Sequence, residues 1–382
     1  MTRALDGIRV VDFSHVVAGP LATHFLALNG AEVIKVESPA GDPLRNYTSD
    51  AAELGMAPAF AGINAGKSSV VLDLKSAQGH ADALALAATA DIIVENFRPG
   101  VMARLGLDYD AIRAVNPRVI YCAVSGFGQN GEMRDVAAID QIVQSLSGLM
   151  YLTGQEGDPA MRVGFPIVDT FTGLLAAFAI QTALVQRERG GAQGQLIDVA
   201  MLDATLVMLL SVVNPMLMTG QAPQRTGNRG FSRAPTADTF RCRTGEITVG
   251  AVSENHVVKL LDVLGLSALL ADAAFADPIA RVTNADAMRP ALAHVFLQRD
   301  AAAWEAELQA AGVPAAQVLD VAGAISLAKR QERDLFLDLN GTQMLNAGFR
   351  FRTDGPSADR PAPKLGAQTD EFTKKPAHTK RA

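Results

Sequence analysis

One carboxylate, Asp169, stands in the run VGFPIVDTFTG, directly before a long apolar pattern with helical spacing. Backbone amides at the start of a helix favour the charged form of an acid, so the sequence predicts that Asp169 is held ionised. An ionised carboxylate can attack a carbonyl such as that of a thioester and form a covalent intermediate. The same placement also suits a simple helix N-cap. The residues alone leave both interpretations open.

Basic side chains gather in two short segments that suit a phosphate-bearing ligand. Lys67 and Lys75 flank a strand-like run in NAGKSSVVLDLK, and Arg98 and Arg104 lie in NFRPGVMARLG. Cationic groups beside helix N-termini are what such a ligand requires. A solvated surface with ordinary helix caps is the competing interpretation.

Other residue types with potential chemistry give weaker signals. Five arginines lie between residues 225 and 243, and guanidinium groups suit a carboxylate substrate, although a solvated loop explains most of them. Cys242 lies in a strand pattern between two arginines with no histidine nearby, so we interpret it as incidental. Cys122 lies in a strand that looks buried, and we expect it in the core.

Alternating strand and helix signals in the first 130 residues must position these groups. The predicted strands are Ile8–Phe13, Ala31–Glu37, Asp91–Glu95 and Arg118–Ser125, and the predicted helices include Leu21–Leu28 and Gly79–Thr89. This alternation predicts a parallel sheet covered by helices on both faces. Ligands of such sheets bind outside the carboxyl ends of the strands, where His15 and Asn96 fall. No G-x-G-x-x-G motif follows the first strand, so a nicotinamide cofactor has little support.

Composition sets limits on the class of protein. The chain has 382 residues, 49% hydrophobic and 19% charged, which favours a compact globular protein. Its net charge of -6 argues against a general nucleic-acid binder. Two cysteines give no disulfide framework, so a reducing compartment is expected.

Neither a signal peptide nor a membrane span is predicted. The N-terminus has no apolar signal-peptide core, and the most apolar run, Leu206 to Met218, is interrupted by Ser211, Asn214 and Pro215. We therefore expect a cytoplasmic protein with no membrane partner. Farther along, residues 227–235 suggest a loop, TADTFRCRTGEITVGA a hairpin, His256–Leu264 and Ala301–Ala311 helices, and KKPAHTKRA a loose basic tail.

A set of motifs spread over nearly the whole chain resembles the family III CoA-transferases. The motifs are LDGIRVVDFSHVVAGP, GAEVIKVESPAGDPLR, NAGKSSVVLDLK, ADIIVENFRPG, NPRVIYCAVSGFGQNG, VGFPIVDTFTG and RERGGAQGQLIDVAMLDA. The resemblance implies an α/β protein that forms an interlocked homodimer. It implies a large Rossmann-like, CoA-binding domain of parallel sheet (residues 1–200 with 325–382), a linker (201–224) and a smaller α+β domain (225–324).

The resemblance also assigns roles to residues. It implies that Asp169 is the nucleophile and carries CoA as a thioester during transfer from an acyl-CoA to a small carboxylic acid. Succinyl-CoA is a reasonable donor, and a small dicarboxylate or hydroxy acid a reasonable acceptor. No metal or tightly bound cofactor is implied, because CoA is a substrate. The implied CoA contacts are His15, Val17, Ala18, Leu72, Asp73, Leu74, Lys75, Asn96, Phe97, Arg98 and Arg104.

The chain departs from the family pattern at several positions. Some relatives carry CoA-contacting cations where this chain has Ser38 and Ala137, so Arg45 or another basic group must substitute. The run of consecutive glycines found in formyl-CoA transferases is absent, which puts formyl-CoA and oxalate in doubt as substrates. The closing helix of the family is replaced by KKPAHTKRA.

Two other functions compete with transfer. An α-methylacyl-CoA racemase needs a second acid or base, which relatives supply as a histidine before an aspartate, but here Ile139 precedes Asp140. A non-catalytic CoA-binding protein is the other alternative, and the intact segment around Asp169 argues against it.

Overall fold

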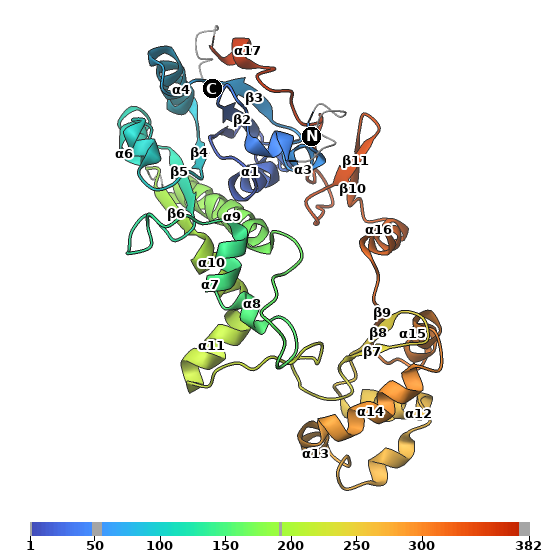
Figure 1. Cartoon of the computed structure of the whole chain (residues 1–382). Coiled ribbons are helices and arrows are strands. Elements are labelled where there is room, and N and C mark those ends of the chain that lie inside the picture. The colour runs from blue at the N-terminus through green and yellow to red at the C-terminus, as the bar shows by residue number, and fades with distance from the viewer. Residues whose placement is uncertain (1, 48–55, 191–192, 374–382) are drawn as a thin grey trace. The chain divides into compact units, whose positions relative to one another are not determined.

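The computed structural model describes residues 2–47, 56–190 and 193–373 and divides the chain into two compact units. Unit 1 comprises Met1–Met150, Arg162–Gln221 and Gln331–Ala382, and unit 2 comprises Tyr151–Met161 and Ala222–Arg330. Figure 1 shows the elements of both units in chain order by colour. The basic tail expected at KKPAHTKRA lies outside the described residues.

Unit 1 is built around a six-stranded, wholly parallel sheet. Its strands are β1 (Arg9–Asp12), β2 (Glu32–Glu37), β3 (Ser68–Val71), β4 (Ile92–Glu95), β5 (Ile120–Ser125) and β6 (Leu196–Ala200), in the order β3-β2-β1-β4-β5-β6. In this order the winding direction reverses between β1 and β4. Ligands of doubly wound sheets bind at that point, outside the carboxyl ends of the two strands.

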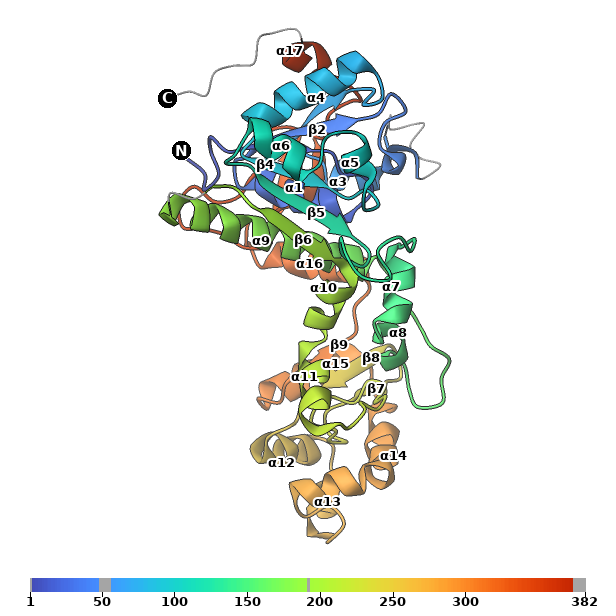
Figure 2. The same cartoon turned by 90° about the vertical axis from the view of Figure 1, so that its left-hand side faces the viewer.

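The helices of unit 1 connect and cover these strands. They are α1 (Ala18–Leu28), the 3₁₀ helix η1 (Pro43–Asn46), α3 (Pro58–Gly62), α4 (Ala77–Thr89), α5 (Val101–Arg104), α6 (Tyr109–Val115), α7 (Asp140–Leu146), α8 (Leu149–Leu152), α9 (Ile167–Gly190), α10 (Met201–Met208) and α11 (Leu210–Thr219). Figure 2 shows α4 and α6 on one face of the sheet and α9 on the other. Two hydrophobic cores result, one between the sheet and α1 with α9, the other between the sheet and α4 with α6.

Buried strands explain the composition of these segments. Val10, Val33 and Ile92 lie side by side across β1, β2 and β4 and are fully buried in one core. Val11, Ile34 and Ile93 lie in the next register position and are buried in the other core. Since both faces are covered, these strands are continuous runs of apolar residues rather than alternating ones.

The end of the described chain returns to the outer edge of the sheet. After a hairpin of β10 (Phe336–Leu339) and β11 (Thr342–Leu345), residues 363–369 run beside β3, and α17 (Thr369–Thr373) follows. Side chains of Gln368 and Thr369 accept hydrogen bonds from the backbone amides of Ser69 and Val71 at 2.9 Å. These contacts satisfy amides that an exposed edge strand would leave unpaired.

Unit 2 is a small α+β body with its own core. An antiparallel sheet of β7 (Thr239–Arg241), β8 (Glu246–Val249) and β9 (Ala315–Gln317) packs with α12 (Glu254–Val263), η2 (Ser267–Ala271), α13 (Pro278–Thr283), α14 (Ala285–Phe296) and α15 (Ala301–Ala310), and α16 (Val321–Arg330) ends the unit. Trp304 is buried there, and its indole N–H donates to the Phe296 carbonyl at 3.0 Å.

Most predicted elements are present, with differences at their ends. The four strands, the hairpin at β7–β8 and the helices at α1, α4, α12 and α15 are confirmed. Helix α1 starts at Ala18, so Gly19 and Pro20 belong to its first turn and not to a preceding turn. Residues 201–224, expected as a linker, contain the helices α10 and α11.

One described helix, α9, is long and apolar enough to span a membrane by length and composition alone. Core helices of soluble proteins meet the same criterion, and α9 contributes Ala176, Ala177 and Ile180 to the core of unit 1. The pair α10 and α11 passes only as one bent span, with an angle of 82° between the two helices.

Candidate active site

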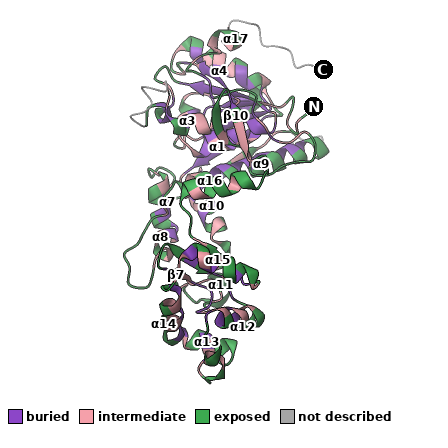
Figure 3. Ribbon diagram, turned by 90° about the vertical axis from the view of Figure 1, so that its right-hand side faces the viewer, coloured by how far each residue is buried: buried purple, intermediate pink, exposed green. Residues whose placement is uncertain are grey.

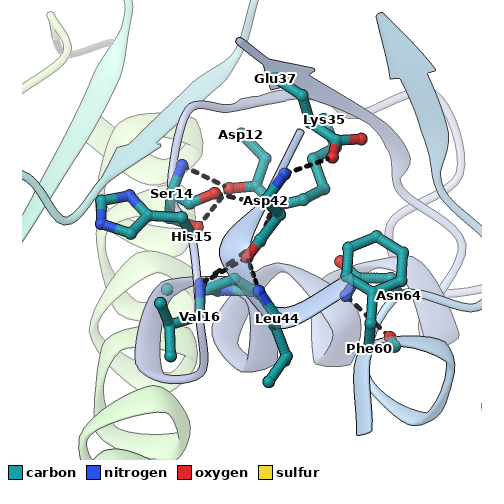
Figure 4. Close-up of polar contacts among 12 residues, drawn as sticks. Asp12, Ser14, His15, Val16, Lys35, Glu37, Asp42, Leu44, Phe60 and Asn64 are labelled. Atoms are coloured by element: carbon teal, nitrogen blue, oxygen red, sulfur yellow. Dashed lines mark hydrogen bonds and ion pairs between the residues drawn. The ribbon is translucent and has the colours of Figure 1, made fainter. Parts of the chain in front are cut away.

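The loop that leaves β1 is held by the side chains of Asn96, Asp42 and Lys35, which come from other segments. Figure 4 shows Asp42 and Lys35 beside this loop. Asn96, just after β4, accepts a hydrogen bond from the His15 amide and donates one to the His15 carbonyl, both at 2.8 Å. Asp42 accepts from the Val16 amide at 3.2 Å. Val16 has a φ of +66°, a conformation that β-branched residues avoid, so these bonds maintain a strained backbone at the sheet's switch point.

A cluster of fully buried charges lies beneath this loop. Lys35 donates to the Ser14 carbonyl at 2.7 Å and forms an ion pair with Asp42 at 2.9 Å. Lys67 pairs with Asp12 at 3.1 Å and donates to the Pro20 carbonyl at 2.8 Å. All four charged side chains are at most 1% exposed.

The cluster shifts the pKa values of its members in opposite ways. Burial raises the pKa of Asp12, but Lys67, Lys35 and two hydroxyl groups outweigh burial and hold it at about 2. Burial lowers the pKa of Lys67 to about 8 although Asp12 opposes the change. Lys67 therefore stabilises the end of β1 and the start of α1 through Asp12 and the Pro20 carbonyl. The interpretation of Lys67 as part of a surface phosphate site was wrong, because its ammonium group is enclosed.

Arg45, considered as a substitute for missing CoA contacts, is also engaged elsewhere. Its guanidinium group donates to both carboxylate oxygens of Glu37 at 2.7 Å and to the Pro363 carbonyl at 3.1 Å. It lies 3.8 Å from the centre of the Phe60 ring. The buried pair balances the charge of Arg45 and uses three of its five N–H groups, and Arg45 does not line the cavity described next, so the structure argues against the expectation for Arg45.

A cavity of about 700 Å³ opens at the carboxyl ends of β1, β2 and β3. It collects seven of the residues expected to bind CoA: His15, Leu72, Asp73, Leu74, Lys75, Phe97 and Arg104. The His15 and Phe97 rings lie 5.1 Å apart at a tilt of 53°. Burial lowers the pKa of His15, so this imidazole is neutral near pH 7. The cavity has a size suited to a cofactor-sized ligand.

Four expected CoA contacts lie outside the lining of this cavity. Val17 and Ala18 form the entry into α1, and Asn96 holds the His15 loop as described above. Arg98 lines a second, smaller cavity of about 270 Å³. Asn96 therefore affects the cavity indirectly, because it positions the loop that carries His15.

Asp169 lies within the first turn of α9, and the amides of that turn donate to a different carboxylate. Asp140, at the start of α7, accepts from the backbone amides of Val168 at 2.8 Å and Asp169 at 3.1 Å. Gln144 donates to the other oxygen of Asp140 at 2.6 Å. The helix start is therefore capped by Asp140, and the N-cap interpretation of Asp169 was wrong.

The protonation state expected for Asp169 also needs correction. Burial, and then the charge of Asp140, raise the pKa of Asp169 to about 7. The sequence predicted the opposite, a carboxylate stabilised by helix amides. Asp140 accepts hydrogen bonds from two of those amides and adds a like charge, so Asp169 is a destabilised carboxylate, more basic than an ordinary one.

The face of α9 that carries Asp169 packs on the start of α1. Gly173, one turn after Asp169, is so close that an added Cβ atom would lie 2.7 Å from the Ala18 carbonyl oxygen and 3.1 Å from the Leu21 Cβ. A side chain at position 173 would force α1 and α9 apart. The glycine therefore brings the first turn of α9 against the helix that follows the His15 loop.

Three of the remaining candidate residues have structural partners within their own unit. In unit 2, Arg229 pairs with Asp286 at 2.7 Å and Arg243 with Asp300 at 2.8 Å. Cys122 is fully buried in the core of unit 1, as expected. Among the described residues, no group of three or more His, Cys, Asp or Glu side chains could hold a metal ion.

Sequence reasoning missed the residues that support the site. Asp140 and Gln144 carried no recognised signal beyond the absence of a histidine at position 139. Lys35 and Asp42 lie in a strand and in the GDP run after it, where ordinary surface positions were as plausible. Polar residues within otherwise apolar strands, such as Asp12 in RVVD and Lys35 in EVIKVE, were the available clue.

Comparison with known proteins gives concordant matches. The family model CoA-transferase family III matches residues 5–369. The acetyl-CoA:oxalate CoA-transferase of Acetobacter aceti is 37% identical and covers 95% of this chain and 93% of its own length. The succinate–glutarate CoA-transferase of Agrobacterium fabrum is 35% identical, with the same two coverages.

A solved structure has the same fold over almost the whole chain. The crystal structure of a CAIB/BAIF family protein from Brucella suis superposes with a TM-score of 0.89 at 32% sequence identity. The match covers 97% of this chain and 99% of that one.

Proposed function

The chain belongs to CoA-transferase family III and is an enzyme of the acyl-CoA:carboxylate CoA-transferase type, and from this premise we propose that Asp169 carries CoA as a covalent thioester between two carboxylic acids. The observation that carries the proposal is the state of Asp169. Its carboxyl group is half-buried, its pKa is about 7, and the amides that would stabilise its charge bind Asp140 instead. Such a carboxylate is available as a nucleophile at neutral pH.

The proposed reaction proceeds through four balanced steps. An Asp169 oxygen attacks the thioester carbonyl carbon of the donor, and the CoA thiolate leaves to give a mixed anhydride. The thiolate then attacks the Asp169 carbonyl carbon, which releases the donor acid as a carboxylate and forms the aspartyl-CoA thioester. The acceptor carboxylate attacks this thioester to form a second anhydride and free the thiolate. Attack of the thiolate on the acceptor's acyl carbon yields the new acyl-CoA and restores Asp169.

The protein's part in these steps is to place and protect the reacting groups. The cavity at the carboxyl ends of the strands takes the nucleotide end of CoA, with Lys75 and Arg104 facing its phosphates. The braced His15 loop gives the ligand a fixed wall, since Asn96 and Asp42 hold its backbone. Anhydrides and thioesters are lost to water when exposed, so we propose that this site excludes bulk water during transfer.

We propose that the donor is succinyl-CoA and the acceptor a small dicarboxylic acid. Similar proteins support this class, since their names specify oxalate, glutarate and mesaconate as substrates. Oxalate is thus included among the acceptors, although the glycine run of formyl-CoA transferases is absent. A panel of acyl-CoA donors tested against mono- and dicarboxylates distinguishes these possibilities. Activity confined to monocarboxylates would refute the dicarboxylate assignment.

A second copy of the chain is the proposed partner. Exposed apolar side chains line the helices of unit 1. Figure 3 marks exposed positions along α9 in green. They include Ile142 and Leu146 on α7, Leu174, Phe178 and Val185 on α9, and Leu210, Leu217 and Met218 on α11. Apolar surface on this scale marks an interaction site. A homodimer in light scattering, lost in Phe178→Glu, is the expected result, and a wild-type monomer would contradict it.

The covalent intermediate provides the direct test. Incubation with an acyl-CoA followed by hydroxylamine or mass spectrometry is expected to mark Asp169. A racemase would instead exchange the α-hydrogen of its substrate with deuterated water, and a non-catalytic binding protein would do neither. Turnover without a label on Asp169 would refute the mechanism.

A further inference from the structure

Two arginine side chains converge above the backbone of Gly100. Arg104 Nη1 and Arg134 Nη2 each lie 3.4 Å from the point that a Cβ atom on Gly100 would occupy. The two nitrogens are therefore no more than twice 3.4 Å apart. Gly100 has a φ of +80°, and its missing side chain leaves room for both guanidinium groups.

Neither guanidinium group has an ion-pair partner among the described residues. In the described part of the chain, Arg104 and Arg134 have no carboxylate within ion-pair distance, whereas Arg45 and Arg187 are paired with Glu37 and Asp91. Two like charges held this close repel each other. An anion between them would remove the repulsion and give each group a partner.

The two arginines lie where the proposed CoA cavity and the smaller cavity share a wall. Val101 and Arg104 line the first cavity, and Gly100 and Arg134 line the second. The four-residue helix α5 supplies side chains to both. An anion bound between the arginines would thus lie at the edge of the space proposed for CoA.

Other cations near the cavity are engaged by the protein. Arg45 is committed to Glu37 and to the Pro363 carbonyl, and Lys35 is committed to Asp42 and to the Ser14 carbonyl. Arg134, in the loop after β5, is therefore positioned with Arg104 to offer positive charge at the edge of the cavity.

We propose that Arg134, together with Arg104, binds a phosphate group of the CoA nucleotide. Charge-assisted bonds from guanidinium groups to phosphate oxygens are about 2.8 Å long, so one tetrahedral phosphate can bridge two nitrogens within this upper limit. The phosphate is either the 3′-phosphate of the ribose or part of the diphosphate. This inference rests on the proposed CoA-transferase function.

The test measures the affinity of the full chain for CoA and for 3′-dephospho-CoA by calorimetry. Arg134→Gln is compared with the wild type and with Arg113→Gln, which removes an exposed arginine from α6 outside both cavities. Arg134→Lys keeps the positive charge but loses the planar guanidinium group, which can donate two parallel hydrogen bonds to one phosphate. Thermal unfolding of each variant shows whether the fold is retained.

We expect Arg134→Gln to weaken CoA binding about tenfold or more, since hydrogen bonds to charged groups are worth that factor. Arg113→Gln should bind as the wild type does, and Arg134→Lys should fall between. An unchanged affinity of Arg134→Gln for 3′-dephospho-CoA assigns the 3′-phosphate, and an equal loss for both ligands assigns the diphosphate.

Affinity of Arg134→Gln within twofold of the wild type for both ligands would overturn the inference. If the wild type still transfers CoA in that case, the proposed function stands and only the role of Arg134 fails. A wild-type chain that binds no CoA would overturn both together.

Discussion

Two groups of buried carboxyl groups in unit 1 differ in how their charge is balanced. Beneath the His15 loop, Asp12 and Asp42 each face a lysine at about the length of a hydrogen bond. At the start of α9, Asp169 faces Asp140, a second carboxylate. In the paired group the pKa of Asp12 is held at about 2, and the carboxylates hold the backbone in place. The pKa of Asp169 is raised to about 7, so its ionised form is more basic than an ordinary carboxylate, at some cost to stability.

The largest effect is expected from removing the unpaired nucleophile. Asp169→Ala should lower transferase activity by about a thousandfold or more, because no other described carboxylate occupies its place in the first turn of α9. The fold should be retained, because the amides of that turn bind Asp140 and not Asp169. Steady-state kinetics and circular dichroism check the two parts. Substantial turnover in Asp169→Ala would contradict the proposal that Asp169 is the nucleophile.

Breaking the paired group should act on stability. Lys67→Met leaves Asp12 buried without its ion pair, which should cost about 3–5 kcal/mol of unfolding free energy. Arg118→Met breaks a pair with Glu188 in which both side chains are more than half exposed, and should cost less than about 1 kcal/mol. Urea unfolding measures both. Equal losses would show that burial of the Asp12–Lys67 pair has no special weight.

The pH dependence of kcat/KM tests the raised pKa of Asp169. The pKa of Asp169 is raised from 3.8 to about 7, so its nucleophilic, ionised form accumulates as the pH rises through about 7. Below that pH, kcat/KM should fall about tenfold per unit. Asp140→Asn removes the like charge and should move this limb to lower pH, whereas Asp135→Asn, an exposed neighbour, should not. A profile flat between pH 5 and 8 (about the range in which histidine also titrates) would contradict a raised pKa.

The smallest effect is expected at His15, which the paired group positions. Because burial lowers the pKa of His15, we propose that its imidazole contacts CoA as a neutral ring beside Phe97. His15→Ala should weaken CoA binding several-fold, by roughly the value of one neutral contact, without changing the pH dependence of binding above pH 7. Isothermal titration at pH 7 and 8 measures this. An unchanged affinity would limit His15 to packing.

Local sequence predicted most of the order of elements in unit 1. Short runs rich in β-branched residues, such as RVVD and IIVE, favour strands covered on both faces, and the helical patterns between them favour parallel connections. The ends of elements were less well predicted. Strand β6 (Leu196–Ala200) was not predicted, and Asp169 falls inside α9 rather than ahead of it, because a helix start depends on which groups accept its amide hydrogens.

What the sequence determined by itself is a parallel sheet covered by helices on both faces and the ligand-binding edge near His15 and Asn96. These depend on residue type and on spacing along the chain, which are local. The resemblance of its motifs to a known family singled out Asp169 as the candidate nucleophile. Only the tertiary structure decided the partners of each charge: Lys67 with Asp12, Arg45 with Glu37, and Asp140 with the amides of α9. Burial and the distance between groups far apart in sequence set a pKa. For that reason the tertiary structure, and not the order of residues, raises the pKa of Asp169. The tertiary structure also places Arg134 beside Arg104 with no ion-pair partner among the described residues.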